Sequence, residues 1–600
     1  MRRSLPMSKV QRLAPFKDLR QRIVNLSRLI SFLELAAFTA FTLMLFFSSS
    51  GDWDYFFSTA EADRRSWVID HQPPLWSYQF CAGVTRSGDP QSFGLSPLFL
   101  PVLAAGPFWG LKLMVLISLL IGYGAFCALF SQLLGRPARI GDRIWIRSCA
   151  LSFLFGNFFL WHLIVGQITV VLIPLVLAIA AAALAFLRAP PQGSGAWVSG
   201  KAQAFRWLSI VALTATCLAG GFNIAVIFFI LPLTVAGVGA LGLARPRESW
   251  RRMGAVALAC ALGVALAWPK IHSVLDYQAR YPRTDATKLV EPAILASTPL
   301  LQLAPTLAGR LLGLWNSPEP YTIPEYSAFS VNAWALLVLV IAALAFHRRG
   351  YAFRSPTKGL TIFLGMILLV GASLSLGDSS LLSLHALLNR ILAGSVRAIG
   401  RYQLLFSLSA ALGGFSLMQC SRHLRNFAIR RMAFPWALLA VLNLITFTGE
   451  LTPEATAMIM RFSANRSDLA GMNRIAVVKR RNIRGSYMFP GLSSGLAVTN
   501  CYDPIVRGTV LSRELEGRPE VYDPVLRRFR EGYVYPIVAS EIGNPPDSCR
   551  LGTYFTQNEI HMDSSCPEGT CLNVNDVRDE DKAWLRFNRE AGKYCLHRRP

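Results

Sequence analysis

Charged residues are scarce in this chain, and acidic residues are the scarcer of the two signs. Only 16% of its 600 residues are Asp, Glu, Lys or Arg, while 53% are hydrophobic. Soluble globular proteins carry about 25% charged residues. Many apolar runs approach the roughly 20 residues that cross the hydrocarbon core of a bilayer. The scarcity of charge excludes an ordinary soluble protein and predicts a mostly α-helical polytopic membrane protein.

The chain also lacks nucleotide-binding loops and internal repeats. No GxxxxGK[ST] or GxGxxG segment occurs between a predicted strand and a helix, so we expect no nucleotide cofactor. The formal net charge is +25, but the basic residues lie in short connections between apolar runs, as in cytoplasmic loops. A nucleic-acid surface would interleave them with aromatic residues. We therefore expect a lipid bilayer, and no nucleic acid, as partner.

The apolar runs predict about eleven membrane spans, each about as long as a crossing helix needs. We expect spans over residues 30–47, 106–134, 144–164, 168–187, 207–218, 224–243, 255–268, 333–346, 360–376, 402–418 and 435–447. A cytoplasmic N-terminus keeps every strongly basic connection on the cytoplasmic side. This predicts a basic cytoplasmic segment (1–29) and a membrane domain (30–448) with outer loops at 48–105 and 269–331.

Residues 449–600 lack long hydrophobic runs and contain many turn residues. The alternating stretches 496–499 and 533–538 are typical of strands, so we expect an extracytoplasmic β-rich domain, a β-sandwich. Five of the eleven cysteines lie there, and Cys81 lies in the first outer loop. An oxidising exterior permits disulfides among these six, with Cys566 and Cys571 as one candidate pair. A zinc site is the alternative, which the absence of CxxC or paired-His spacing disfavours.

Two carboxylates, Asp52 and Asp54, directly follow the first predicted span. On an extended segment, residues two apart point the same way. One carboxylate can then act as a general base while the other positions it, or both can bind a divalent metal such as Mg²⁺ or Mn²⁺. The alternative is a pair of solvated acids at a helix end.

The rest of the first outer loop carries basic and aromatic side chains. Its candidates for binding a phosphate are Arg64, Arg65 and His71. Its candidates for stacking on a sugar are Trp53, Trp76 and Tyr78. Aromatic residues also anchor membrane proteins at the interface, and both interpretations stay open for these three.

The acidic segment resembles a known family motif. Gly51-Asp52-Trp53-Asp54 after the first span is similar to the acidic motif of the GT-C glycosyltransferases, which are integral membrane enzymes. Ser96-Pro97-Leu98 before a helix adds to the resemblance, and so does Asn157 through Gly166-Gln167, followed by an apolar run with Pro174. Gln167 stands where the family pattern has His. The chain most resembles the bacterial branch with a C-terminal extracytoplasmic β domain.

The resemblance implies a polyprenyl-phosphate-linked sugar donor and an inverting transfer, with Asp54 or Asp52 as the base. A leaving phosphate needs cations. Arg397 and Arg401, four residues apart before the span at 402–418, lie on one helical face. They are the first candidates for binding the phosphate, and Lys270 in the second outer loop is a further one. The alternative for the arginines is snorkelling toward lipid headgroups.

The sequence as a whole predicts a multi-pass glycosyltransferase of the plasma (inner) membrane that glycosylates a glycan, lipid or protein at the outer face. Three alternatives remain: a polysaccharide polymerase or ligase, a lipid or glycan transporter, and a non-catalytic glycan-assembly protein. Transporters commonly show internal repeats. Two polar residues inside predicted spans need hydrogen-bond partners. We expect Glu34 to contact another polar side chain and His162 to bond to a neighbouring helix.

Overall fold

The structure is a computed structural model. It describes residues 9–47, 53–77, 84–134, 138–164, 166–188, 196–222, 246–280, 331–352, 358–375, 384, 387 and 403–449, and several short strands beyond residue 470.

The first half of the chain is helical, with one small hairpin. Its helices are α1 (Lys9–Phe47), α2 (Trp53–Val68), the 3-10 helix η1 (Pro97–Phe99), α3 (Leu100–Leu133), α4 (Ile140–Leu154), α5 (Asn157–Ile164), the 3-10 helix η2 (Ile168–Val171), α6 (Leu172–Leu187), α7 (Ala196–Gly220) and α10 (Pro246–Arg280). The hairpin pairs β1 (Trp76–Ser77) with β2 (Val84–Thr85). The later helices are α14 (Val331–Arg348), α15 (Lys358–Ser375), α17 (Gln403–Cys420), α18 (Arg422–Phe427), the π-helix η6 (Ala428–Met432) and α19 (Ala433–Gly449).

Six helical segments of the described residues are long and apolar enough to cross a membrane: Ile23–Leu45, Pro97–Leu133, Ile168–Leu187, Gly200–Gly220, Arg251–Ala279 and Arg422–Ile445. The prediction of a mostly helical, multi-pass membrane protein is confirmed at this level. The count of eleven spans stays a prediction, because the expected span at 224–243 lies outside the described residues.

The single span expected at 144–164 is wrong. Helix α4 ends at Leu154, and α5 starts at Asn157. Gly156, a weak helix former, lies in the break. The Phe155 carbonyl, which has left the helical ladder, accepts a hydrogen bond from Asn443 Nδ2 of α19 at 2.9 Å. A side chain from a distant helix therefore stabilises the end of α4.

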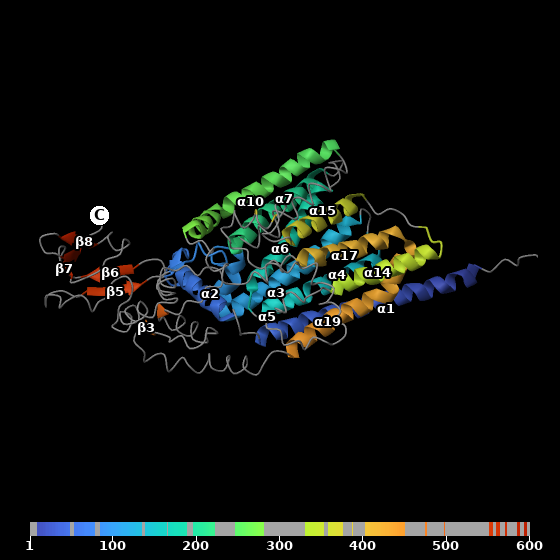
Figure 1. Cartoon of the computed structure of the whole chain (residues 1–600), viewed down its shortest axis with the longest axis horizontal. Coiled ribbons are helices and arrows are strands. Elements are labelled where there is room, and N and C mark those ends of the chain that lie inside the picture. Colours follow the sequence, from blue (N-terminus) through green and yellow to red (C-terminus); the bar gives the residue numbers. More distant parts are fainter. Residues whose placement is uncertain are drawn as a thin grey trace, which may run out of the picture.

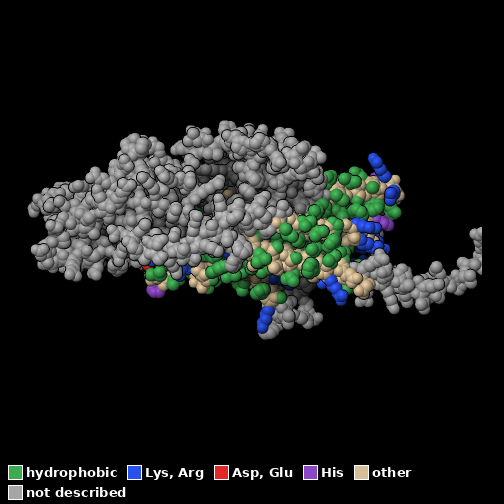
Figure 2. Space-filling view, turned by 90° about the horizontal axis from the view of Figure 1, so that it is seen from below, with side chains coloured by type: hydrophobic (Ala, Val, Ile, Leu, Met, Phe, Trp, Pro, Cys, Tyr) green, Lys and Arg blue, Asp and Glu red, His purple; other side chains and the backbone are tan. Residues whose placement is uncertain are grey.

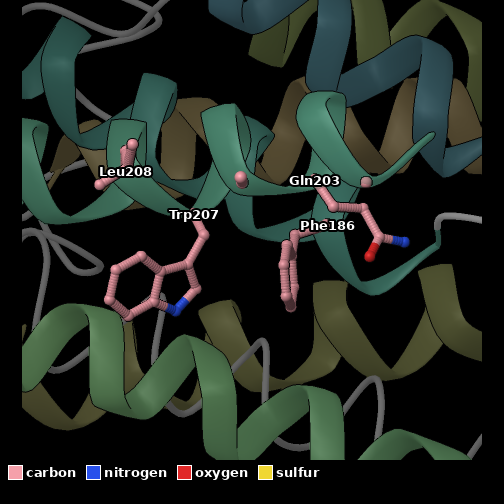
Figure 3. A pocket seen from close by; sticks show the side chains of 6 residues that line it. Phe186, Gln203, Trp207 and Leu208 are labelled. Carbon is pink, nitrogen blue, oxygen red and sulfur yellow. The ribbon is translucent and has the colours of Figure 1, made fainter. Parts of the chain in front are cut away.

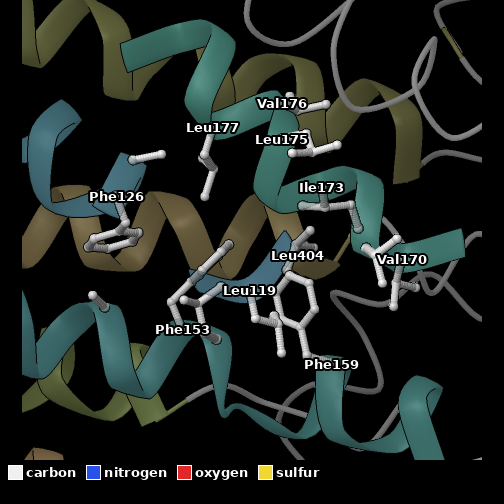
Figure 4. Packing of buried hydrophobic residues seen from close by; sticks show 14 of the residues in the cluster. Leu119, Phe126, Phe153, Phe159, Val170, Ile173, Leu175, Val176, Leu177 and Leu404 are labelled. Atoms are coloured by element: carbon white, nitrogen blue, oxygen red, sulfur yellow. The ribbon is translucent and has the colours of Figure 1, made fainter. Parts of the chain in front are cut away.

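The helices share one apolar core, in which α3 packs along α6. Ring centroids of Phe126 and Phe130 on α3 lie 4.2 Å apart, and Gly122 lets Pro174 approach α3 closely, since a Cβ there would lie 2.4 Å from the Pro174 side chain. Figure 4 shows this region, with labelled residues Leu119 and Phe126 of α3, Phe153 of α4, Phe159 of α5, Val170 of η2, Ile173, Leu175, Val176 and Leu177 of α6, and Leu404 of α17.

Helix α3 is kinked near its start. Gly106 has a φ of 77°, a left-handed conformation open to glycine at little cost, and Pro107 follows it. Below the kink, Gly110 lies so close to the backbone of Val102 that a Cβ would come within 2.3 Å of it. Phe108, just after the kink, packs against Phe57 of α2.

Glu34, the acid inside the first span, has the polar partners that the sequence required. Its carboxylate forms an ion pair with Arg147 of α4 and accepts a hydrogen bond from the Tyr123 hydroxyl of α3. Pairing offsets the cost of placing a charge inside a membrane helix. The three groups therefore tie α1, α3 and α4 together.

Basic side chains gather near one end of the helix bundle. In Figure 1, α2 lies at the end of the bundle opposite the start of α1, and the labelled strands β5 to β8 lie beyond α2. In Figure 2 the visible Lys and Arg side chains gather mainly toward the end where α1 starts, beside a broad hydrophobic flank. The gathering of basic residues toward one end agrees with the positive-inside pattern. The orientation in the membrane stays a prediction, with α2 on the outer side.

Short strands are described in the C-terminal region. They are β3 (Ile475–Ala476), β4 (Ala497–Val498), β5 (Leu551–Phe555), β6 (Ile560–Ser564), β7 (Cys571–Leu572), β8 (Leu585–Asn588) and β9 (Lys593–Leu596). β3 pairs with β4 in parallel, β5 and β6 are antiparallel, and the third sheet has the order β7-β9-β8. β4 lies within the strand expected at 496–499. The strand expected at 533–538 is outside the described residues, and the β-sandwich stays a prediction.

Candidate functional site

The acidic segment leads directly into helix α2. Asp54 is the second residue of α2, so its backbone is helical, and Asp52 lies outside the described residues. The expectation that both acids share one extended segment is therefore wrong at Asp54. The first turn of a helix carries partial positive charge from its N–H groups, which favours a carboxylate there.

The first half of α2 is buried, which is unusual for a helix that carries acids. Trp53 is fully buried. Its indole N–H donates to the Leu163 carbonyl of α5 at 2.9 Å, and its ring stacks on Phe57 with centroids 5.4 Å apart. The prediction that Trp53 stacks on a sugar is therefore corrected: with no exposed surface, this indole anchors the start of α2 to α5.

A buried ion-pair network holds the next segment of the loop against α2. Arg86, only 2% exposed, donates from Nε and Nη2 to the two carboxylate oxygens of Asp63 on α2, at 2.7 and 3.0 Å. Its Nη1 donates to Asp89 Oδ2 at 2.8 Å. The two-pronged contact with Asp63 fixes the guanidinium plane. Arg86 thus bonds the loop that contains it to α2.

Further groups complete this network. Lys270 of α10 is 2% exposed, and its Nζ donates to the carbonyls of Arg86 at 3.2 Å and Asp89 at 2.5 Å. Ser92 Oγ donates to Asp63 Oδ2 at 2.9 Å. We call Asp63, Arg86, Asp89, Ser92 and Lys270 the Arg86 cluster. Two carboxylates face two cations in it, so the buried charges balance.

The shape of the loop depends on one close backbone approach. A Cβ at Gly94 would lie 2.7 Å from Asp63 Oδ2 and 2.8 Å from a Pro74 side-chain carbon. The Gly94 carbonyl accepts a hydrogen bond from the Trp67 indole of α2 at 2.8 Å. A side chain at position 94 would push the loop off the Arg86 cluster.

The charge state of Arg86 follows from its neighbours. Burial by itself lowers its pKa, but the carboxylates of Asp63 and Asp89 outweigh this and raise the pKa above the ordinary arginine value. Arg86 therefore stays protonated at any working pH. Because its donors are used within the cluster, we assign it a structural role in holding the loop and α2 in one arrangement.

The predicted phosphate-binding residues of the first loop do not lie beside Asp54. Arg64 forms an ion pair with Glu61 at 2.8 Å and is 25% exposed. Its hydrogen bond to the Glu61 carboxylate raises the Arg64 pKa, partly offset by burial. Positions 54 and 64 are ten residues apart on α2, which corresponds to a rise of about 15 Å along the helix axis. Arg65 follows Arg64, and the exposed His71 comes after the helix with a φ of 54°. Arg64 and Arg65 therefore lie near the C-terminal end of α2, and His71 lies just beyond that end.

Lys270 also differs from its predicted setting. The outer loop was expected to begin at residue 269, but α10 continues to Arg280. Lys270 is therefore a helical residue, buried in the Arg86 cluster and bonded to two backbone carbonyls. Its contacts hold the first outer loop against α10.

A cation that the sequence analysis missed lies beside the start of α2. Lys112 of α3 is 6% exposed, and its Nζ lies 3.8 Å from the centroid of Phe108. The Phe108 ring packs against Phe57 of α2, with centroids 5.0 Å apart. Asp54 precedes Phe57 by three positions and therefore occupies the same face of α2. The signal was available: a lone lysine inside an apolar membrane helix is a functional candidate.

Several predicted residues cannot be placed. Arg397, Arg401 and Tyr78 lie outside the described residues, as Asp52 does. Trp76 lies on β1, opposite Thr85 of β2. Among the residues that the structure describes, no group of three or more His, Cys, Asp or Glu could hold a metal ion. Metal binding by Asp52 and Asp54 therefore stays a prediction.

The Nδ1 atom of His162 bonds within its own helix, and the expected bond from this side chain to a neighbouring helix stays a prediction. This ring nitrogen lies 2.6 Å from the Phe158 carbonyl, one turn earlier in α5, and the imidazole packs on the Phe158 ring. The contact satisfies a buried polar atom within its own helix.

Comparison with known proteins finds no matching family model and no matching curated protein. Two solved structures match. The chain is similar to the crystal structure of ArnT from Cupriavidus metallidurans bound to undecaprenyl phosphate, with a TM-score of 0.44 and 13% identity over 82% of this chain and 90% of that chain. It is likewise similar to ArnT of the same organism in the apo state, with a TM-score of 0.45 and 13% identity over 83% of this chain and 90% of that chain.

Proposed function

We propose that this chain is a membrane glycosyltransferase of the GT-C type that uses a polyprenyl-phosphate-linked sugar and acts at the outer face of the membrane. One observation carries the proposal: Asp54 is the second residue of a helix whose first half is buried, at the end of the bundle opposite the start of α1. A carboxylate in that position can meet both a lipid-linked donor and an acceptor from outside.

The proposed reaction is an inverting transfer. The Asp54 carboxylate accepts the proton of an acceptor hydroxyl, and the hydroxyl oxygen forms a bond to the anomeric carbon of the sugar. The bond from that carbon to the lipid phosphate oxygen breaks, and the electron pair leaves with the phosphate. The proton on Asp54 then passes to solvent. Asp52 is the alternative base, and either acid could hold a divalent metal.

Cations would stabilise the charge that develops on the leaving phosphate. Lys112 lies over Phe108, whose ring packs against Phe57 of α2, three positions after Asp54. Arg397 and Arg401 remain our candidates from the sequence. Lys270 is not a candidate in this arrangement, because it is buried in the Arg86 cluster.

The Arg86 cluster would serve catalysis indirectly. A reacting group must be held close to its productive position, since small displacements strongly reduce rates. The cluster joins α2, the loop at 84–96 and α10 through buried, charge-assisted hydrogen bonds. It would keep the acidic start of α2 in register with the helices around it.

The donor class is the polyprenyl-phosphate sugar that the acidic motif implies. Undecaprenyl phosphate, the ligand named for one of the similar ArnT structures, is a lipid of this class. The acceptor is a hydroxyl-bearing glycan, lipid or protein.

The test is complementation with Asp54→Asn. A strain lacking this protein should accumulate a lipid-linked sugar that mass spectrometry of lipid extracts identifies. Wild-type protein should remove it, and Asp54→Asn should leave it near the level of the deletion strain, because the amide cannot accept the proton. Asp276→Asn changes an exposed acid near the end of α10 and serves as the matched control.

Membrane abundance of each variant is measured alongside. If Asp54→Asn alone keeps activity, the base is Asp52, and the glycosyltransferase proposal is refuted if Asp52→Asn/Asp54→Asn, at normal abundance, clears the lipid as well as the wild type. A polymerase or ligase that relies on arginine and histidine predicts that result. A transporter predicts that the lipid-linked sugar changes its membrane leaflet and not its total amount.

A further inference from the structure

A groove opens at the other end of the bundle, far from α2 along the helices. It has a volume of about 450 Å³ and is lined by Phe186 of α6 and by Gly200, Gln203, Ala204, Trp207 and Leu208 of α7. Ligand sites commonly have volumes of about 300–1,000 Å³. Figure 3 shows Phe186 and Trp207 projecting side by side toward α10, and the Trp207 indole donates to the Ala255 carbonyl of α10 at 2.8 Å. The floor of the groove is aromatic and apolar.

The groove lies at the level where three candidate spans begin or end. The α6 span ends at Leu187, the α7 span starts at Gly200, and the α10 span starts at Arg251. The groove lining starts at Phe186, next to the end of the α6 span, and continues along α7 from Gly200 to Leu208, into the apolar part of that span. It therefore crosses from the level of lipid headgroups into the hydrocarbon region.

Four cations flank this groove. Two are held by backbone bonds: Arg206 Nη1 donates to the Ala185 carbonyl at 3.3 Å, and Arg252 Nη1 donates to the Leu187 carbonyl at 3.0 Å. These bonds satisfy carbonyls of the last turn of α6, and each uses one of the five N–H groups of a guanidinium. The other two cations, Arg188 and Lys201, are exposed and adjoin lining residues in the sequence.

Helix capping explains the two backbone bonds, but it does not explain an apolar groove at this place. An apolar groove that runs into the hydrocarbon with a rim of Arg and Lys matches one chemistry: an acyl chain below and a phosphate above. Basic pockets between membrane helices on the cytoplasmic side recognise anionic lipid headgroups in this way.

We propose that the groove between α6, α7 and α10 is a binding site for an anionic glycerophospholipid. One acyl chain lies on Phe186 and Trp207, and the phosphate lies among Arg188, Lys201 and Arg206. This site is separate from the proposed active site. A bound lipid would join the ends of α6, α7 and α10, where two arginine-carbonyl bonds and one indole bond already link these helices.

The test is lipid binding by the purified full-length protein, measured by native mass spectrometry. The protein is titrated with phosphatidylglycerol and, separately, with phosphatidylcholine. Phosphatidylglycerol should bind more tightly. In Arg188→Gln/Lys201→Gln, which keeps both helix-capping arginines, its affinity should fall about thirtyfold, since each basic residue near a lipid surface contributes about a fivefold effect. Phosphatidylcholine binding should stay the same.

Two further variants separate the groove from charge in general. Arg143→Gln/Arg430→Gln removes two exposed arginines of α4 and η6 and should change phosphatidylglycerol affinity by less than about twofold, as expected for charges outside the site. Ala204→Trp fills the groove with all cations intact and should abolish the tight binding.

The proposal is overturned by any of three results: equal losses in the two charge variants, unchanged binding in Ala204→Trp, or preferential binding of undecaprenyl phosphate over phosphatidylglycerol in the same groove. None of them bears on Asp54, so the site can fail while the glycosyltransferase proposal stands.

Discussion

Replacing Arg86 with Met should open the first outer loop without removing any group from the proposed chemistry. Met keeps much of the length of the side chain but has no charge and no donor. The variant loses three charge-assisted hydrogen bonds of 2.7, 3.0 and 2.8 Å and leaves Asp63 and Asp89 buried without their guanidinium. Breaking a buried pair by removing one partner costs about 3–5 kcal/mol.

The loss of stability should first increase local opening of the segment that Arg86 holds, residues 84–96. At 25 °C, every 1.4 kcal/mol is a factor of ten, so local opening of residues 84–96 should become about a hundredfold to a few thousandfold more frequent. Hydrogen–deuterium exchange of the detergent-solubilised protein measures this directly. Peptides from residues 84–96 should exchange faster by that factor, and peptides from α6 should be unchanged.

Arg64→Met is the matched control, because it also removes an arginine from an ion pair of the same helix. The Arg64–Glu61 pair is 25% exposed on the arginine side, and such pairs contribute at most about 1 kcal/mol. Exchange at 84–96 should therefore change little. If peptides 84–96 exchange as slowly in Arg86→Met as in the wild type or in Arg64→Met, the structural role assigned to the Arg86 cluster is wrong.

Three further predictions concern charge, the membrane helices and the C-terminal region. Because the folded pKa of Arg86 is raised, its contribution is complete below the unfolded arginine pKa and is lost only as pH rises through the higher folded value. The difference in exchange between wild type and Arg86→Met should therefore stay constant from about pH 6 to about pH 7, and a difference that shrinks across this range would contradict it. Glu34→Gln should lower the free energy of unfolding by about 1–3 kcal/mol, a range reduced because its ion pair with Arg147 is partly exposed. In thermal melting, adding Arg147→Gln to Glu34→Gln should cause little further loss. Fully additive losses would argue against the ion pair. Cys571 and Cys595 lie directly opposite each other in the antiparallel pair β7–β9, a separation that suits a disulfide; non-reducing peptide mapping should find them linked, and free thiols at both positions would refute this.

The disulfide prediction revises the sequence-based one. Nearness in sequence pointed to Cys566 with Cys571, whereas the register of β7 and β9 places Cys595 opposite Cys571. Pairing is a property of strand register, and strand register depends on contacts between segments that are distant in the chain.

Hydropathy and charge bias predicted the membrane class, most of the helices and the acidic segment that opens α2. These features depend on local composition, because a span needs only a sufficient run of apolar residues. The same information could not show that 144–164 breaks at Phe155–Gly156, where Asn443 from a distant helix bonds to the freed carbonyl. Nor could it show that α10 continues beyond 269.

The site divides in the same way. The amino-acid sequence by itself determined that carboxylates follow the first span and that basic residues collect in certain connections, since both are matters of order along the chain. Only the tertiary structure decided that Trp53 is an internal anchor, that Arg86 and Lys270 belong to a buried network, and that Lys112 lies over a Phe108 ring that packs against α2. Burial and partnership depend on which helices pack together, and a charged side chain acts as ligand, base or structural tie according to the groups that surround it.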